Sequence, residues 1–216
     1  MNILFDLYGT LIDIKTDESK DSFWQEFADK VNVSDFQELK NKYYSTCARL
    51  QEEKEEIEIR DVFKEIVEYD TEEACLIFRE LSTEYISLYD GVIMLLEKLK
   101  KNHKLFVLSN AQSSFTIPEL KKLKIYDYFN GIAISSDYGY KKPNPKFFQN
   151  AISDFNIIDD ICMIGNDYEC DIKPAIKLGL KTIFIESNLT PKNECSNKII
   201  GFNCNEIIEN INKLQK

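Results

Sequence analysis

Residues 2–11 read NILFDLYGTL, in which a short apolar run at 3–5 leads directly into Asp6 and then into a glycine and a threonine. A run this short and this apolar, ended by polar and turn-forming residues, predicts a strand that is buried on both faces. Such strands occur in parallel sheets covered by helices, where ligands bind beyond the carboxyl ends of the strands. Asp6 is therefore expected at the ligand-binding edge of a sheet.

Four further apolar runs repeat this pattern, at 105–108, 132–134, 161–164 and 182–185. Between and after them, apolar residues at helical spacing predict helices over 91–101, 117–123, 145–155 and 171–178, and Gly179 follows the last as a helix stop. Residues 199–200 and 207–211 suggest a short strand and a closing helix. Strands that alternate with helices predict an α/β fold with a Rossmann-like parallel sheet as its core.

Residues 17–88 break this rhythm, because they hold no strand-like run and are dense in apolar residues at helical spacing. Four helices inserted after the first strand are expected to form a small bundle above the sheet. The expected domains are a core of residues 1–14 and 90–216 and an all-helical cap of residues 15–89. The acidic run EEKEE at 52–56 is expected to be a solvated helix face or loop.

The 216-residue chain has 44% hydrophobic residues and a formal net charge of −10, which indicates a packed globular protein. The charge disfavours nucleic acid and anionic membranes as partners. No apolar stretch is long enough to span a bilayer, and the N-terminal residues do not resemble a secretory signal. The six cysteines form no C-x-x-C pair, which favours reduced thiols. A cytoplasmic protein that is a monomer or a homodimer is expected.

A carboxylate, a hydroxyl, a lysine and a second group of acids are expected to meet at one edge of the sheet. They are Asp6, Ser109 with Asn110, Lys142, and the stretch from Asn166 through Asp167 to Asp171. A carboxylate is a competent nucleophile toward phosphorus, and it divides a difficult hydrolysis into two easier steps. Because a phosphoryl group and a carboxylate repel each other, a cation must lie between them, and Mg²⁺ takes oxygen ligands in such sites.

The residue types at this edge suggest separate roles. Asp6, the backbone carbonyl of Tyr8 and the acids near Asp167 can supply oxygen ligands to Mg²⁺. Ser109 and Lys142 can donate to phosphoryl oxygens and offset the charge that develops during transfer. Gly9 permits a tight turn whose backbone N–H groups can bind the same oxygens.

In this order, these residues resemble the haloacid dehalogenase-like superfamily. The matching motifs are Asp6-x-x-Gly-Thr10, Ser109, Lys142-Pro143 and the Gly-x-Asp-x-x-x-Asp stretch that ends at Asp171. The resemblance covers almost the whole chain, because the helical insert lies where that family places its cap.

The resemblance implies a hydrolase that acts on a small phosphorylated metabolite through an aspartyl-phosphate on Asp6. The residues that it assigns to catalysis and to the phosphoryl group are Asp6, Thr10, Ser109, Lys142, Tyr8, Gly9 and Asn110. The oxygen ligands that it offers to Mg²⁺ are those of Asp6, Tyr8, Asn166, Asp167 and Asp171, with the choice among the last three open. Arg60 is the cap residue expected to reach inward toward the substrate.

Tyr8 departs from the family pattern, because most phosphatases of the superfamily carry a second aspartate at this place as general acid and then base. A tyrosine hydroxyl, with an ordinary pKa of about 10, is a poor proton donor to an alkoxide at neutral pH. One interpretation is a phosphatase whose leaving groups depart without protonation, such as acyl or aryl phosphates, or take a proton from elsewhere. Another is a phosphonatase-like enzyme, which also lacks the second aspartate. The resemblance then implies a lysine of the cap that forms a Schiff base with the substrate.

A third interpretation is a metal-free 2-haloacid dehalogenase, because those enzymes resemble this chain most closely around Tyr8. Against it, Phe148 stands where they carry a tyrosine, and extra acids such as Asp167 are unfavourable beside an anionic haloacid without a metal. A non-catalytic family member that acts as a binding protein is the remaining alternative. The retained Asp6, Thr10 and Lys142 argue against it.

Overall fold

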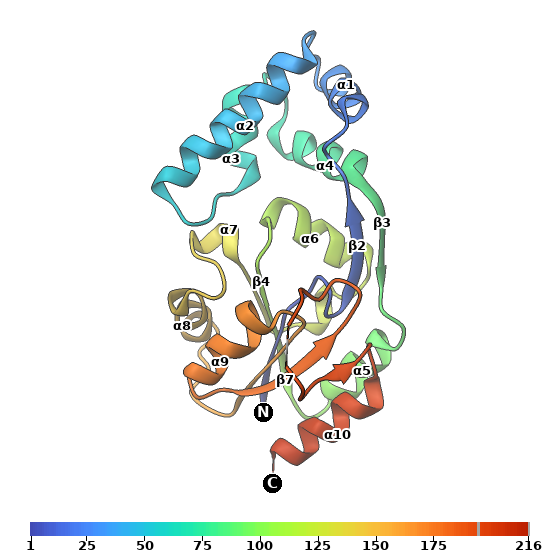
Figure 1. Cartoon of the computed structure of the whole chain (residues 1–216), viewed down its shortest axis with the longest axis vertical. Coiled ribbons are helices and arrows are strands. Elements are labelled where there is room, and N and C mark those ends of the chain that lie inside the picture. Colours follow the sequence, from blue (N-terminus) through green and yellow to red (C-terminus); the bar gives the residue numbers. More distant parts are fainter. Residues whose placement is uncertain (194, 216) are drawn as a thin grey trace.

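The structure is a computed structural model that describes residues 1–193 and 195–215. Its core is a six-stranded parallel sheet in the order β5-β4-β1-β6-β7-β8. Both ends of the chain lie at this core, at the bottom of Figure 1. The strands are β1 (Asn2–Phe5), β4 (Lys104–Ser109), β5 (Gly131–Ile134), β6 (Ile161–Gly165), β7 (Lys181–Glu186) and β8 (Ile199–Ile200). The predicted α/β fold and its parallel sheet are confirmed, including the short strand near the end of the chain.

Helices cover both faces of this sheet. They are α5 (Val92–Leu99), α6 (Ser113–Lys122), the 3₁₀ turn η1 (Tyr126–Tyr128), α7 (Ser135–Tyr138), α8 (Pro145–Asp154), the π-helical turn η2 (Tyr168–Ile172), α9 (Lys173–Lys177) and α10 (Cys204–Leu214). Side chains along a strand point to alternate faces. Accordingly, Ile3 and Phe5 of β1 pack in one cluster with residues of α5 and α10, while Leu4 packs in another with Phe147 and Phe148 of α8.

Two core helices differ in extent from the prediction. Helix α6 begins at Ser113 instead of 117, and Pro118 lies inside it. The helix predicted over 171–178 is a π-helical turn that begins at Tyr168 and continues into α9. Asp167 starts this turn, because its side chain accepts the backbone N–H groups of Glu169 and Cys170.

The inserted helical cap is confirmed, with helices α1 (Asp21–Lys30), α2 (Phe36–Glu53), α3 (Ile59–Ile66) and α4 (Thr71–Ser82). The four helices enclose their own aromatic core, in which Trp24, Phe27 and Phe63 are fully buried. The domain boundaries themselves stay a prediction. In the described part of the chain, none of the helices is both long and apolar enough to cross a membrane.

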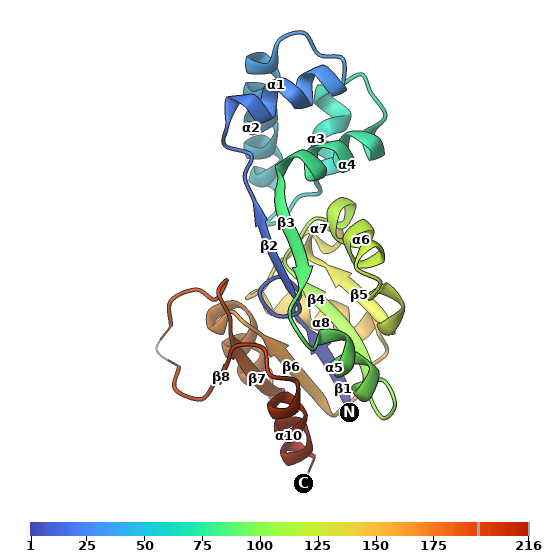
Figure 2. The ribbon, with the colours of Figure 1, turned by 90° about the vertical axis from the view of Figure 1, so that its right-hand side faces the viewer.

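Two antiparallel strands, β2 (Ile12–Thr16) and β3 (Thr83–Leu88), join the cap to the core (Figure 2). The expectation that residues 17–88 hold no strand is therefore wrong for 83–88. This segment alternates exposed and partly buried residues, and its threonine, tyrosine and isoleucine suit a half-buried strand. The predicted boundary at 14/15 falls inside β2, so this strand pair connects both parts of the chain.

The acidic run at 52–56 lies at the end of α2 and in the loop after it, and Glu52, Glu53, Lys54 and Glu55 are exposed, as expected of a solvated helix face or loop. Two carboxylates of the run also contact the core. Glu55 accepts the side-chain amide of Asn144 at 2.6 Å, and Glu56 lies 3.8 Å from the ammonium of Lys141. Glu58, only 7% exposed, accepts the backbone N–H of Ser113 at 2.9 Å and so caps the first turn of α6 from the cap domain. Acidic side chains stabilise helix N-termini in this way, so these carboxylates seat the cap on the core.

Candidate active site

Asp6 lies at the centre of the carboxyl edge of the sheet. It follows β1, whose neighbours are β4 on one side and β6 on the other. Ser109 ends β4 and Asn166 follows β6, so the two flank Asp6 from opposite sides. The chain order reverses across β1, which is the type of position where open parallel sheets bind ligands.

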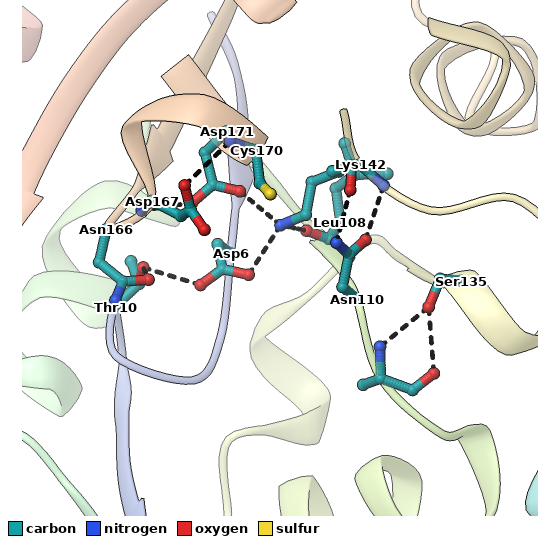
Figure 3. A network of polar contacts seen from close by, with 11 residues as sticks. Asp6, Thr10, Leu108, Asn110, Ser135, Lys142, Asn166, Asp167, Cys170 and Asp171 are labelled. Carbon is teal, nitrogen blue, oxygen red and sulfur yellow. Dashed lines mark hydrogen bonds and ion pairs between the residues drawn. The ribbon is translucent and has the colours of Figure 1, made fainter. Parts of the chain in front are cut away.

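Lys142 connects the two carboxylates of the site (Figure 3). Its ammonium lies 2.7 Å from Asp6 Oδ1 and 2.7 Å from Asp171 Oδ1, and it donates to the carbonyl oxygen of Leu108 at 2.8 Å. Burial alone lowers the pKa of Lys142, but the charges of Asp171 and Asp6 outweigh burial and raise it above its ordinary value. Lys142 is therefore a buried cation that donates two hydrogen bonds and forms an ion pair with Asp171.

Asn110 holds the backbone of Lys142, although the sequence suggested that it contacts substrate. Its Oδ1 accepts the N–H of Lys142 at 2.7 Å, and its Nδ2 donates to the carbonyl of the same residue at 2.8 Å (Figure 3). Ser109 is different, because its Oγ is fully buried and has no hydrogen-bond partner within residues 1–193 and 195–215. A buried hydroxyl without a partner is costly, so this donor is available to a ligand oxygen at the sheet edge.

The second carboxylate oxygen of Asp6, Oδ2, lies in the turn formed by Gly9 and Thr10 and beside Asn166. Thr10 donates to Asp6 Oδ2 at 3.0 Å. The Asn166 amide faces three acceptors, so its nitrogen is the atom that lies 3.2 Å from Asp6 Oδ2, 3.1 Å from the Tyr8 carbonyl and 3.3 Å from Thr10 Oγ1. Gly9, at φ +86°, is required here, because a Cβ atom on it would lie 2.1 Å from the other terminal atom of the Asn166 amide.

The two aspartates of the fourth motif have different surroundings. Asp171 is buried and its Oδ2 accepts the backbone N–H of Asp167 at 2.9 Å. Burial raises the pKa of Asp171 above its usual range, Lys142 opposes this effect, and Asp6 adds to it. Asp167 is only partly buried, and one of its oxygens is used to start η2.

The oxygens around Asp6 form a donor set that fits a hard divalent cation. A cavity of about 170 Å³ opens here, and its lining includes Asp6, Tyr8, Asn166, Asp167 and Asp171. Among the described residues, no group of three or more His, Cys, Asp or Glu side chains is placed to hold a metal ion. An ion at this place could use the Asp6 carboxylate, the Tyr8 carbonyl and, once the amide turns its oxygen toward them, Asn166, which are ligands of the type that Mg²⁺ takes.

The Tyr8 hydroxyl contacts residues of α6 that do not line the cavity around Asp6. It donates to Glu119 of α6 and lies 3.0 Å from Thr116 Oγ1. Arg79 of cap helix α4 donates to the same Glu119 carboxylate at 2.5 Å. The sequence did not indicate Glu119 or Arg79, because residues 40 positions apart on two helices carry no spacing signal; only the structure brings them to Tyr8.

Arg60 does not reach the site. It pairs with Glu72 at 2.6 Å within the cap and lies outside the cavity that holds Asp6. The reason is local, because α3 and α4 pack side by side and present opposite charges to each other. Arg49 is likewise paired with Glu65 of the cap. The prediction of Arg60 as an inward-facing cap residue is therefore not supported by its position.

Comparisons with known proteins indicate the family and the fold of this chain. A family model described as haloacid dehalogenase-like hydrolase matches residues 3–185. The chain is 30% identical over 100 residues to pyrimidine 5'-nucleotidase YjjG of Escherichia coli, a match that covers 45% of this chain and 44% of that protein. It is 24% identical over 204 residues to human N-acylneuraminate-9-phosphatase, covering 86% and 82% of the two chains. The first of these matches thus spans less than half of the relative's length.

Two solved structures share the fold over nearly the whole chain. A 2-haloacid dehalogenase from Pseudomonas syringae has a TM-score of 0.66 at 18% identity, covering 98% of this chain and 97% of that one. The hydrolase YfnB from Bacillus subtilis, described as bound to magnesium, has a TM-score of 0.60 at 19% identity and covers 98% of each chain. With the family match extending over most of its length, the chain belongs to the haloacid dehalogenase-like hydrolases.

Proposed function

We propose that this protein is a Mg²⁺-dependent phosphatase that hydrolyses a small phosphorylated metabolite through an aspartyl-phosphate on Asp6. The observation that carries the proposal is the position of the Asp6 carboxylate, 7% exposed at the edge of a cavity and oriented by Lys142 and Thr10. A carboxylate held in one direction by two donors is prepared for attack with little loss of entropy. The cytoplasmic location expected from the sequence stays part of this proposal.

The residues around Asp6 then act on the transferred group. Lys142 offsets the charge of Asp6 and of the incoming phosphoryl oxygens, and Ser109 and Thr10 supply hydroxyl donors. Asn110 keeps the backbone of Lys142 in place. These groups are fixed before substrate arrives, so little reorganisation accompanies the reaction.

Mg²⁺ would be held by Asp6, the Tyr8 carbonyl and Asn166, whose amide would turn its oxygen toward the ion, with Asp167 nearby. When bound, it supplies positive charge between the nucleophile and the phosphoryl group. Two relatives support a phosphate ester as substrate, since the names of the nucleotidase and the N-acylneuraminate-9-phosphatase describe phosphatases. The magnesium-bound YfnB structure supports the ion.

A metal-free 2-haloacid dehalogenase is the second candidate. Tyr8 favours it, and so does the Asn166 amide, whose nitrogen donates to both Asp6 and the Tyr8 carbonyl without a cation. Such an enzyme must bind the carboxylate of its substrate. Arg49, Arg60 and Arg79 are each engaged with a glutamate, so none of them is ready for that role. The phosphatase is therefore the better-supported reaction.

The test is hydrolysis of acetyl phosphate and 4-nitrophenyl phosphate with Mg²⁺ and with EDTA, beside halide release from 2-chloropropionate. We expect phosphate release that EDTA abolishes and that added Mg²⁺ restores. Halide release that is independent of metal, without phosphate release, would establish the dehalogenase instead. Absence of turnover of all three compounds by folded protein would leave the binding protein as the remaining interpretation.

Asn166→Asp should raise the affinity for Mg²⁺ about tenfold or more, because it replaces a neutral amide with a carboxylate beside Asp6. Without metal, the added negative charge should lower the thermal midpoint of unfolding below that of the wild type, and Mg²⁺ should reverse this order. Calorimetric titration with Mg²⁺ and melting curves in EDTA measure both effects without relying on activity. Asn41→Asp, at an exposed position on α2, is the matched control. Equal Mg²⁺ affinity in all three proteins would show that the ion does not bind at Asn166.

A further inference from the structure

The Tyr8 hydroxyl is removed from the reaction centre by a closed set of contacts. It donates to Glu119 and lies 3.0 Å from Thr116 Oγ1, and both partners belong to α6 and are buried. Arg79 covers this group from the cap, with its guanidinium 5.9 Å from the Tyr8 ring and 5.1 Å from the Phe115 ring. The phenolic proton is thus committed to a carboxylate that does not line the cavity around Asp6.

A useful general acid must place its proton within hydrogen-bond reach of the leaving group. The Tyr8 hydroxyl is instead held by Glu119 and Thr116 of α6. Tyr8 therefore does not meet this condition in this structure.

Among the other side chains that line the Asp6 cavity, Asp171 is paired with Lys142 through Oδ1 and accepts the Asp167 N–H through Oδ2. Asp167 accepts two backbone N–H groups at the start of η2. The ammonium of Lys142 donates to Asp6 and to the Leu108 carbonyl. The Asn110 amide is used on both sides by the backbone of Lys142. His103, the one histidine of the sequence, precedes β4 and so lies at the opposite edge of the sheet from Asp6.

From these proton donors and their partners we infer that the substrates are phosphoryl compounds whose leaving group departs as a stable anion. Specifically, we infer acyl phosphates, which are the mixed anhydrides of a carboxylic acid and phosphoric acid. The inference rests on the proposed function and names its substrate class. The small cavity of about 170 Å³ suits a short acyl chain. An alkyl phosphate, in contrast, would have to expel a basic alkoxide without a proton.

The two steps balance without a proton from the protein in the first of them. An oxygen of Asp6 forms a bond to phosphorus, the bond from phosphorus to the acyl oxygen breaks, and its electron pair leaves on the carboxylate product. Water then attacks the phosphorus of the aspartyl-phosphate and releases the Asp6 carboxylate. Both hydrogens of that water end on the phosphate, which leaves as the monoanion.

The experiment is a leaving-group series on the full chain with Mg²⁺: acetyl phosphate, 4-nitrophenyl phosphate, phenyl phosphate and ethyl phosphate, in order of rising leaving-group basicity. We expect kcat/KM to fall steeply from acetyl phosphate to ethyl phosphate. This fall should exceed the fall in an enzyme that has a general acid by about 10²–10⁴-fold, which is the usual contribution of such an acid. The Tyr8→Asp variant supplies a carboxylate beside the nucleophile and should flatten this dependence by raising turnover of ethyl phosphate. The Tyr8→Phe variant should keep the steep slope whatever its absolute rate, because a damaged site slows all four substrates alike.

The possible results distinguish a wrong substrate class from a wrong proposed function. A flat dependence in the wild type, with acetyl phosphate turned over, would overturn the substrate class and leave the phosphatase intact. A selective loss of ethyl phosphate turnover in Tyr8→Phe would also overturn it, because the hydroxyl would then be the acid. No phosphate release from any member of the series would overturn the proposed function itself.

Discussion

Asp6→Asn should lower phosphate release by at least about 10³-fold, because the variant lacks the nucleophile on which the two-step route depends. The asparagine retains the shape of the side chain, and Lys142 still has Asp171 and the Leu108 carbonyl as partners. The fold should therefore persist. Phosphate release at saturating acetyl phosphate and Mg²⁺ measures the loss of turnover, and a urea unfolding curve verifies that the protein is folded.

A covalent readout separates the role of Asp6 from a general loss of activity. Wild-type protein quenched in acid during turnover should carry the added mass of one phosphoryl group on the peptide that contains Asp6, and the variant should carry none. Asp29→Asn, at an exposed cap position, is the matched control and should behave as the wild type in both measurements. Turnover by Asp6→Asn within tenfold of the wild type would sink the aspartyl-phosphate mechanism.

The sheet and the site it supports were predictable because they depend on local patterns. The run at Ile3 to Phe5 is buried on both faces in a parallel sheet, and any residue after such a strand lies at its carboxyl edge. Asp6, Ser109 and Asn166 therefore meet for reasons that spacing alone supplies. Strand β3 was missed because its signal is that of a half-buried strand, which pairs only with β2 and has no buried apolar run.

The contacts between the cap and the core could not be predicted, because they depend on how two separately folded parts meet. Glu58 caps α6 across 55 positions of the chain, and nothing in an acidic run distinguishes such a carboxylate from a solvated one. The contact between Arg79 of the cap and Glu119 of the core could not be predicted either, and neither could the hydrogen bond from the Tyr8 hydroxyl to Glu119. The sequence identified the unusual tyrosine, but only the structure shows that its hydroxyl donates to Glu119, outside the cavity around Asp6.

Lys142→Met should destabilise the protein by about 3–5 kcal/mol at neutral pH, because it leaves the carboxylates of Asp6 and Asp171 buried without their shared cation. Methionine is similar in length to the lysine stem, so the loss reports charge more than volume. Urea unfolding at pH 7 measures the difference. Activity should fall as well, because Lys142 offsets charge on Asp6 and the phosphoryl group.

The pH dependence gives this prediction a definite sign. The pKa of Lys142 in the folded protein is raised above the unfolded value of about 10.4, so the stability that the charge supplies is fully present below about pH 10 and is lost as the pH rises toward the folded-state pKa. The difference in unfolding free energy between wild type and Lys142→Met should therefore shrink above about pH 10. Lys141→Met is the matched control, since that lysine is 43% exposed and lies 3.8 Å from Glu56, and it should cost at most about 1 kcal/mol. If the two methionine variants were equally stable at pH 7, the Lys142 ammonium would not be the cation that balances Asp6 and Asp171, and its place in the mechanism would have to be withdrawn.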